Sequence, residues 1–183
     1  KYFNSPLLYK ENGFKEEYTA KLLIESLQEE PVDMPVIENI ERKKENKNAP
    51  LLYNLAELQN DCSKFFKISP DQTLQIVQEL YEKKMVTYPR TDARVLSTAV
   101  AKEIYKNISG LRNYQICSGF ASEILEKGSY KGISKTRYVN DKQITDHYAI
   151  IPTGQGLNNL NSLNPTAANV YETITRRFLS VFY

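Results

Sequence analysis

Residues suited to binding a transition metal are scarce in this sequence, which has one histidine and two cysteines among 183 residues. A single histidine, His147, cannot form a histidine-cluster metal site. Cys62 and Cys117 lie far apart and do not form a Cys-x-x-Cys pair. We therefore expect two buried free thiols and no metal site in this chain.

Long apolar runs are also missing, and no stretch approaches the roughly 20 apolar residues that a membrane-spanning helix needs. The chain begins at Lys1 and has no apolar segment typical of a signal peptide. We therefore expect a piece of a larger intracellular protein that is located in the cytoplasm.

Neither sign of charge is in large excess, because 24 Lys and Arg residues accompany 22 Asp and Glu residues and the net charge is +2. That total does not indicate a nucleic-acid binder. The distribution says more, since residues 94–142 contain nine Lys and Arg residues against four Asp and Glu residues. Such a local excess suits contact with phosphates, and it also fits an ordinary solvated surface.

Helix signals are the commonest local pattern in the chain. In the clearest case Ser69 suits an N-cap and Pro70 the first helical position. Capping residues and apolar spacing predict helices over 16–30, 54–66, 70–84, 97–110, 120–126 and from 164 onward. Strands are expected at 36–45 and 149–152, with a short one within 130–139. The predicted fold class is mainly α with a small β portion (α+β).

Pro50 marks the first expected domain boundary. The predicted domains are residues 1–50, 51–152 and 153–183, with the middle one mostly helical. Its two helices before Val86-Thr87-Tyr88 resemble the core of a helix-turn-helix or winged-helix domain. Such a likeness in shape does not by itself make a DNA-binding protein.

The stretch whose side chains are best suited to catalysis runs from Tyr88 to Asp92. Pro89 fixes its own φ and keeps Tyr88 out of the helical region, so the Tyr is expected on extended backbone. Arg90 lies two residues on and therefore faces the same side. A phenol that can act as a nucleophile beside a guanidinium that can hold phosphoryl oxygens suits attack on a phosphate. The same residues also fit a plain turn in which Asp92 caps the next helix.

Two motifs resemble those of one enzyme family. Tyr88-Pro89-Arg90-Thr91-Asp92 resembles the active-site motif Tyr-x-Arg-Thr-Asp-Ser of type IA DNA topoisomerases, in the form typical of topoisomerase III. Asp146-His147-Tyr148-Ala149-Ile150-Ile151-Pro152-Thr153 resembles that family's Asp-His-His-Ala-Ile-Ile-Pro-Thr. Further family-like segments occur in the expected order at 55–59, 73–75 and 176–179, and the resemblance runs from about residue 35 to the end.

The resemblance implies specific roles for residues of both motifs. Tyr88 would be the nucleophile, Arg90 would stabilise the phosphoryl group, and His147 would meet the DNA backbone near the scissile phosphate. The residues expected to contact DNA are Thr91, Asp92, Arg94 and Tyr148. Two positions depart from the family pattern, because Ala93 replaces a Ser and Tyr148 replaces a second His.

The resemblance also implies a partner, a cofactor and a division of labour. The full-length enzyme would cleave a single-stranded DNA segment, pass another strand through the break and reseal it without ATP, as a nucleoid-associated monomer. It would use Mg²⁺ bound by a Toprim domain, and this chain contains no Asp-x-Asp motif. The chain alone is therefore expected to be inactive. Residues 1–50 and 153–183 would be incomplete pieces of neighbouring gate domains.

Other classes of protein remain open. The chief alternative is a non-enzymatic, winged-helix-like DNA-binding module in which Tyr88 merely packs. Tyrosine recombinases place several Arg and His residues before the Tyr, whereas His147 follows it here. Rolling-circle nickases and relaxases need a His cluster, and this chain has one His. Both of these enzyme classes are disfavoured.

Overall fold

A computed structural model describes residues 13–14, 16–28, 39–45 and 47–183, and it divides the chain into two compact units, 1–45 and 46–183. In the first unit, helix α1 (Glu17–Gln28) carries an ion pair between Lys21 and Glu17 and buries none of its described residues. Residues 39–45 have no regular secondary structure and are all exposed. The predicted strand at 36–45 is therefore wrong over 39–45, where a charged run has little apolar surface to bury. Its start, 36–38, lies outside the described residues.

The second unit is built from α-helices and short 3₁₀ helices. The α-helices are α2 (Leu55–Phe66), α3 (Pro70–Glu82), α4 (Thr98–Leu111), α5 (Ser118–Lys127) and α6 (Pro165–Ser180). The 3₁₀ helices are η1 (Ser129–Lys135), η2 (Asp141–Gln143) and η3 (Leu157–Ser162). No helix in the described part of the chain is both long and apolar enough to cross a membrane. The prediction of a mainly helical fold is confirmed.

The β portion is smaller than the sequence suggested. Within the described ranges it consists of three isolated bridges, which join Tyr53 to Ile150, Val86 to Pro152 and Leu96 to Val139. Two of them involve the predicted strand 149–152, which forms single bridges and no ladder. The segment 130–139, where a short strand was expected, is mostly η1.

Helix α3 shows why the helix starts were predictable. The Ser69 hydroxyl accepts a hydrogen bond from the Gln72 N–H, while the Gln72 side chain accepts one from the Ser69 N–H. Pro70 follows at the first helical position, where no N–H is needed. The side chains of Asn54, Ser97 and Asn164 each accept one backbone N–H at the start of α2, α4 and α6, without the reciprocal bond. The N-cap predicted at Ser69 is confirmed, and the helices expected to begin near 54, 97 and 164 begin there.

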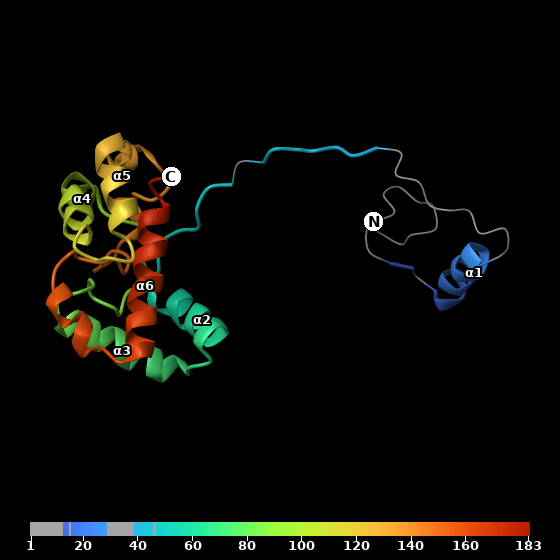
Figure 1. Ribbon diagram of the computed structural model, residues 1–183, viewed down its shortest axis with the longest axis horizontal. Coiled ribbons are helices and arrows are strands. Elements are labelled where there is room, and N and C mark those ends of the chain that lie inside the picture. Colours follow the sequence, from blue (N-terminus) through green and yellow to red (C-terminus); the bar gives the residue numbers. More distant parts are fainter. Residues whose placement is uncertain (1–12, 15, 29–38, 46) are drawn as a thin grey trace. The chain divides into compact units, whose positions relative to one another are not determined.

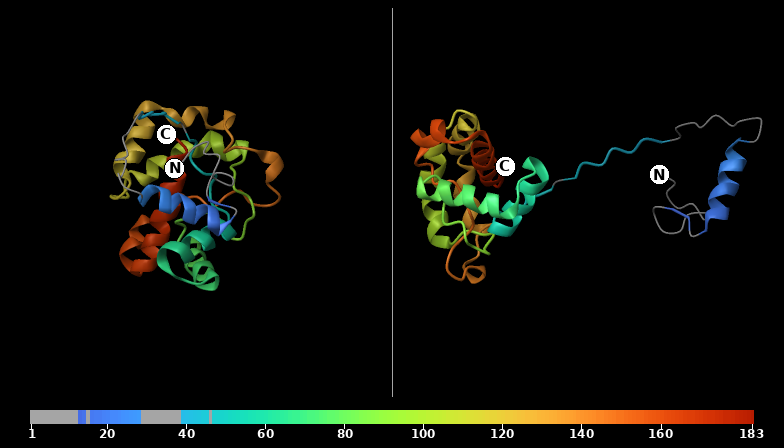
Figure 2. Two further views of the ribbon diagram at one scale, coloured as in Figure 1. Left: turned by 90° about the vertical axis from the view of Figure 1, so that its right-hand side faces the viewer. Right: turned by 90° about the horizontal axis from the view of Figure 1, so that it is seen from below.

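Helix α6 connects the two helical pairs of the second unit. Figure 1 shows α2 and α3 at one end, α4 and α5 at the other, and α6 (red) running past both; the left view of Figure 2 agrees. The Tyr171 ring of α6 meets the Tyr114 ring after α4, with centroids 5.2 Å apart. Fully buried side chains of α6, including Ile174 and Phe178, belong to one continuous apolar core. Cys62 and Cys117 are buried free thiols in that core, as predicted.

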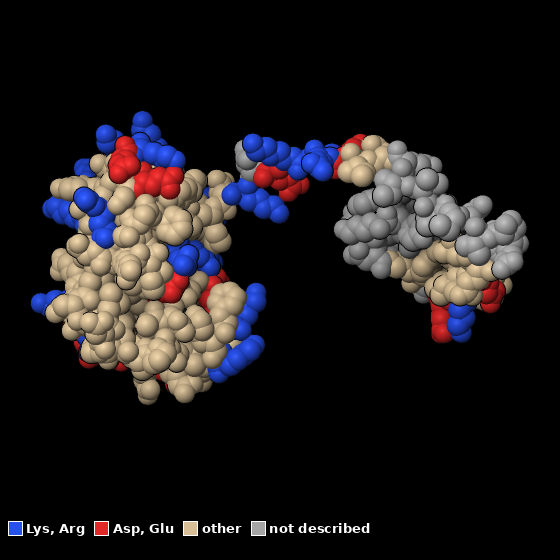
Figure 3. All heavy atoms as spheres, in the orientation of Figure 1, with Lys and Arg blue, Asp and Glu red and all other residues tan. Residues whose placement is uncertain are grey.

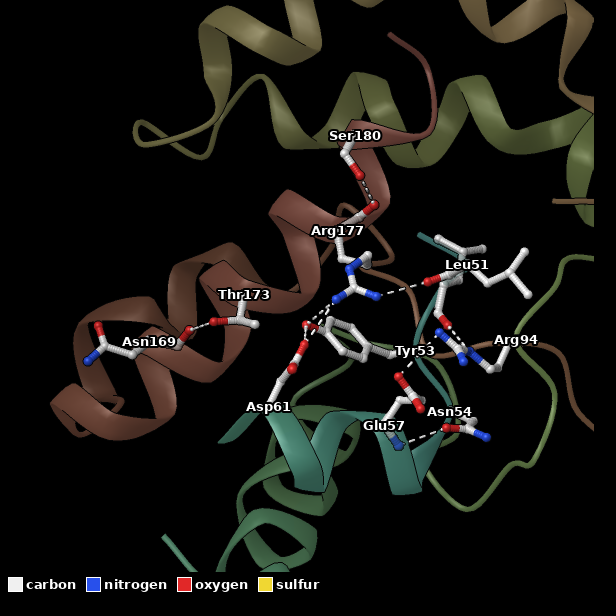
Figure 4. A network of polar contacts seen from close by, with 11 residues as sticks. Leu51, Tyr53, Asn54, Glu57, Asp61, Arg94, Asn169, Thr173, Arg177 and Ser180 are labelled. Atoms are coloured by element: carbon white, nitrogen blue, oxygen red, sulfur yellow. Dashed lines mark hydrogen bonds and ion pairs between the residues drawn. The ribbon is translucent and has the colours of Figure 1, made fainter. Parts of the chain in front are cut away.

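One polar cluster fixes α6 to the start of the unit (Figure 4). The Arg177 guanidinium donates hydrogen bonds to the Leu51 carbonyl (3.0 Å), the Tyr53 hydroxyl (3.1 Å) and an Asp61 oxygen (2.9 Å). It also lies over the Tyr53 ring, 4.2 Å from the centroid. Burial, followed by the hydrogen bond to Asp61, raises the pKa of Tyr53. The cluster joins α6, α2 and the segment 51–53.

Candidate active site

The two motif segments lie side by side, joined through Thr87. The Thr87 hydroxyl donates to the Ala149 carbonyl at 3.0 Å and accepts from the Ile151 N–H at 2.9 Å. The Thr87 N–H donates to the Ile151 carbonyl at 3.0 Å. One residue therefore makes three hydrogen bonds to the second motif, directly before Tyr88.

Thr91 makes a second connection on the other side of Tyr88. Its hydroxyl donates to the His147 carbonyl at 2.8 Å and accepts from the Ala93 N–H at 3.1 Å. The side chain is buried, with 7% of the residue exposed. The expected contact between Thr91 and DNA does not fit this geometry, because the hydroxyl already uses its proton on a protein carbonyl inside the fold. The structure instead makes Thr91 a support for the backbone of His147.

These connections place the Tyr88 and His147 side chains against each other. The Tyr88 and His147 rings lie with centroids 4.3 Å apart and planes tilted by 42°. Tyr88 is half-buried and His147 is exposed. On its other side the Tyr88 ring meets the Tyr81 ring of α3 nearly at right angles, at 5.5 Å. The Tyr88 ring is thus held between two aromatic neighbours, as an oriented nucleophile requires.

A cleft of about 560 Å³ opens over this pair. Its lining includes side chains from the end of α3, from both motifs and from the loop after Pro152: Tyr81, Glu82, Lys84, Val86, Thr87, Tyr88, His147, Tyr148, Thr153 and Gln155. Tyr148 is half-buried, and burial raises the pKa of its phenol. Tyr88, His147 and Tyr148, three of the residues singled out from the sequence, therefore share one cleft.

Arg90 and Asp92 lie on the same segment but do not line the cleft. Both residues are exposed. Within the described part of the chain, neither side chain forms a hydrogen bond or an ion pair; the Asp92 carbonyl accepts one from the Asn54 amide at 3.0 Å. The next helix, α4, is capped by Ser97, so the reading of Asp92 as its cap is wrong. Two exposed polar groups without partners among these residues are available to a ligand.

Arg94 has a different environment. It forms an ion pair with Glu57 at 3.3 Å, and its Nε donates to the Leu52 carbonyl at 3.3 Å (Figure 4). These contacts connect the end of the first motif to α2. A DNA phosphate would have to compete with Glu57 for this guanidinium.

Sequence reasoning missed Tyr81 and Lys84, which both line the cleft. Tyr81 carries an apolar ring on α3, and 39% of the residue is exposed. It comes four residues after the core residue Val77 and directly after Leu80, a spacing that puts it on the apolar face of the helix. The contact with Tyr88 depends on tertiary packing.

The basic excess predicted for residues 94–142 does not form one uniform surface. Lys106 pairs with Glu103, and Lys127 pairs with Glu123 at 2.5 Å. On the face drawn in Figure 3, blue and red atoms alternate over the upper part of the second unit, and uncharged atoms cover most of the rest. Local ion pairs thus offset part of the excess.

The described residues can be compared with two kinds of ligand site, a metal site and a tyrosine surface for stacking on DNA bases. In the ranges that the structure covers, no group of three or more His, Cys, Asp or Glu residues is arranged to hold a metal ion. These residues therefore do not fit the Mg²⁺ that the family resemblance implies. Tyr114 and Tyr138 are each only 5% exposed, so neither ring is open to stacking on a DNA base.

Comparisons with known proteins agree with the two motifs. Residues 4–183 match the family model described as DNA topoisomerase. The chain is 37% identical over 171 residues to DNA topoisomerase 3 of Bacillus subtilis, which covers 92% of this chain and 22% of that protein. It is 38% identical over 147 residues to DNA topoisomerase 3 of Bacillus licheniformis (80% and 20%), and 34% identical over 175 residues to that of Shouchella clausii (95% and 23%).

The chain thus spans about a fifth of the length of these relatives, while the family match extends over nearly all of its own residues. Both motifs and the cleft that they form lie within the matched range. The chain belongs to the type IA DNA topoisomerases and is similar to bacterial DNA topoisomerase 3.

Proposed function

We propose that Tyr88 is the nucleophile of a topoisomerase that breaks and rejoins one DNA strand. The observation that carries this proposal is the Tyr88–His147 ring pair in an open cleft, held by the hydroxyl groups of Thr87 and Thr91. A tyrosine that merely packed would not need an exposed histidine on its face and a cleft beside it. Membership of the family supports the same role.

In the proposed reaction the Tyr88 hydroxyl oxygen attacks a phosphorus atom of single-stranded DNA. The bond from that oxygen to phosphorus forms, and the bond from phosphorus to the 3′ oxygen breaks. The phenol proton is balanced by protonation of the leaving 3′ oxygen. The products are a 5′-phosphotyrosine and a free 3′-hydroxyl. Because the phosphodiester is exchanged and not hydrolysed, the reverse reaction reseals the strand without ATP.

Arg90 and His147 have separate roles in this proposal. The exposed guanidinium of Arg90 holds the phosphoryl oxygens and stabilises the charge that develops on them. His147 lies on the Tyr88 ring and meets the DNA backbone beside the scissile phosphate. Thr91 acts through His147, as a positioning residue.

The remaining assignments concern the whole protein. We propose that it acts as a monomer near the nucleoid, and that residues 51–152 form a winged-helix-like active-site domain. Residues 1–50 and 153–183 would belong to neighbouring gate domains. The family's Mg²⁺ ligands would lie in a Toprim domain beyond this chain, so the 183-residue chain alone would not cleave DNA.

The test uses the full-length protein that contains this chain. It is mixed with Mg²⁺ and single-stranded DNA labelled at its 3′ end, which the fragment attached to Tyr88 retains, and the mixture is then quenched with SDS. We expect labelled protein, and we expect Tyr88→Phe to abolish it. Tyr81→Phe and Tyr148→Phe are matched controls from the same cleft, and both should keep the adduct.

Other results would contradict the proposal. An adduct that persists in Tyr88→Phe would move the nucleophile to another residue. DNA binding with no adduct in any variant would favour the plain binding module. Omitting ATP should not change resealing, measured as the disappearance of the adduct after salt is added.

A further inference from the structure

The end of helix α3 has an unusual residue at a position that favours glycine. The Met85 N–H donates to the Leu80 carbonyl at 2.9 Å, and the Lys84 N–H donates to the Tyr81 carbonyl at 2.8 Å. This pair of bonds defines a Schellman motif, whose left-handed residue is usually Gly. Here that residue is Lys84, with φ 61°. A lysine at this position is strained, since its Cβ crowds the backbone.

The strained residue Lys84 places its side chain in the cleft beside Tyr88. Lys84 is exposed and lines the cleft beside Tyr88, and its carbonyl accepts a hydrogen bond from the Thr153 hydroxyl at 2.5 Å. The neighbouring Lys83 is paired with Glu79 at 3.5 Å. Among described residues, by contrast, none forms an ion pair with the Lys84 ammonium. Glu82, the acidic residue of the cleft lining, accepts a hydrogen bond from Gln78 at 3.1 Å.

Tyr81 provides an aromatic surface next to this cation. It lies three residues before Lys84 on the last turn of α3, and 39% of it is exposed. Its ring meets the Tyr88 ring edge to face at 5.5 Å. A partly exposed ring beside a lysine is the combination by which proteins hold single-stranded nucleic acid, with the ring stacking on a base and the cation meeting a phosphate.

We propose that Tyr81 and Lys84 form a subsite for the nucleotide next to the scissile phosphate, with its base on Tyr81 and its phosphate on Lys84. The proposal rests on the proposed function in taking Tyr88 as the point of attack. It adds two positioning residues to the reaction. They would set where along a strand the Tyr88 oxygen meets phosphorus.

The chain offers a matched control for Lys84. Lys67 ends α2 with φ 57°, so it has the same left-handed strain, and it is exposed but does not line the cleft. Lys84→Gly and Lys67→Gly should each raise the melting temperature of the 183-residue chain, by about 3 °C. Only Lys84→Gly should weaken DNA binding. This comparison separates the loss of the ammonium group from the relief of backbone strain.

Binding is measured by fluorescence anisotropy of a labelled oligothymidylate at several salt concentrations. Loss of one phosphate contact should reduce the slope of log affinity against log salt by about 0.7 in Lys84→Gly. Tyr81→Leu should weaken binding about tenfold with an unchanged slope, because stacking involves no counterion. Tyr81→Phe should bind like the unaltered chain. Tyr105→Leu, which removes an exposed ring on α4, is the control for general loss of aromatic surface.

Several outcomes would overturn the subsite. These are equal effects of Lys84→Gly and Lys67→Gly, equal effects of Tyr81→Leu and Tyr105→Leu, or no measurable binding by the unaltered chain at low salt. The adduct assay with Tyr88→Phe is independent of all of them. Loss of that adduct together with unaffected binding in Lys84→Gly would reject the subsite and keep the nucleophile. An adduct that persists in Tyr88→Phe, together with weakened binding in Lys84→Gly, would keep the subsite and reject the nucleophile.

Discussion

Thr87 and Thr91 each use one hydroxyl group to join segments 62 and 56 residues apart in sequence. In both cases the oxygen donates its proton to a carbonyl and accepts an N–H from the backbone. A hydroxyl is the smallest side-chain group that can do both. The orientation of the His147 backbone relative to Tyr88 therefore depends on two hydroxyl groups that are hydrogen-bonded within the protein.

Thr91→Val tests this dependence at the scale of one residue. Valine keeps the shape of the side chain but leaves the His147 carbonyl and the Ala93 N–H without their partner. Leaving buried polar groups unpaired should lower the free energy of unfolding by about 2 kcal/mol. Urea unfolding of the chain measures this, and adduct formation by the full-length protein should fall with it.

Thr91→Ser is the control, because it keeps the hydroxyl and should retain most of the stability and activity. A loss of stability in the Ser variant with none in the Val variant would show that the methyl group matters and the hydrogen bonds do not. A Thr91→Val protein with unchanged unfolding would contradict the support role directly.

At this scale the sequence indicated two candidate side chains of the site but not the residues that support them. Tyr88 and His147 were singled out by chemistry and by the family motifs, and the structure brings their rings together. The role of Thr87 was not predicted, since a threonine in an apolar segment gives no sign of which carbonyl it will meet. Thr91 was expected to contact DNA, because the sequence did not show that its hydroxyl would bond to the His147 carbonyl. Long-range hydrogen-bond partners are set by tertiary packing.

At the scale of elements, a helix start depends on a few neighbouring residues, whereas helix packing depends on residues far apart in the sequence. Ser69 with Gln72 needs only three residues to specify a start. Gly110 was expected to end its helix, yet α4 continues through it to Leu111. The reason lies elsewhere in the chain, because a Cβ on Gly110 would come within 2.2 Å of the Gly154 carbonyl oxygen. The glycine allows α4 to approach the loop after Pro152.

Arg177 and Arg176 form a natural comparison on helix α6. Arg177 bonds to Leu51, Tyr53 and Asp61 from a side chain that is 17% exposed, whereas Arg176 pairs with Glu172 on the helix surface and is 53% exposed. Arg177→Lys should cost about 2 kcal/mol of unfolding free energy, since an ammonium cannot reproduce the planar fork. Arg176→Lys should change stability by less than about 0.5 kcal/mol.

Urea unfolding of the two single variants checks this difference. Because both changes keep the positive charge, a difference between them reports geometry and burial. Similar unfolding midpoints for the two variants would show that the cluster in Figure 4 does not fix α6 to the start of the unit.

At the scale of the whole molecule, a buried thiol and buried phenols should make the free energy of unfolding decrease at alkaline pH. Burial raises the pKa of Cys62 from 9.0 to about 11, and burial, followed by the charge of Glu172, raises the pKa of Tyr114 from 10.0 to about 12. Burial also raises the pKa of Tyr171. Below pH 9 these groups are protonated in both states and their contribution to stability is complete.

As pH rises above 9, the unfolded chain releases protons that the folded chain still holds. Stability should therefore fall steadily from pH 9 to about pH 12. Urea midpoints followed by circular dichroism across this range measure the loss. A midpoint that stays constant up to about pH 11 would show that the Cys62 thiol titrates as it does in water.

The long separation between the two motif segments has a consequence for the protein while it is being made. Ribosomes add roughly 5–20 residues per second. The 56 residues from Thr91 to His147 therefore take on the order of 3 to 11 seconds to synthesise. During that time a nascent chain already contains Tyr88 but lacks the ring and the carbonyl that hold it in place. In the proposed reaction, an unfinished chain therefore carries its nucleophile without the geometry needed to break a strand of the genome.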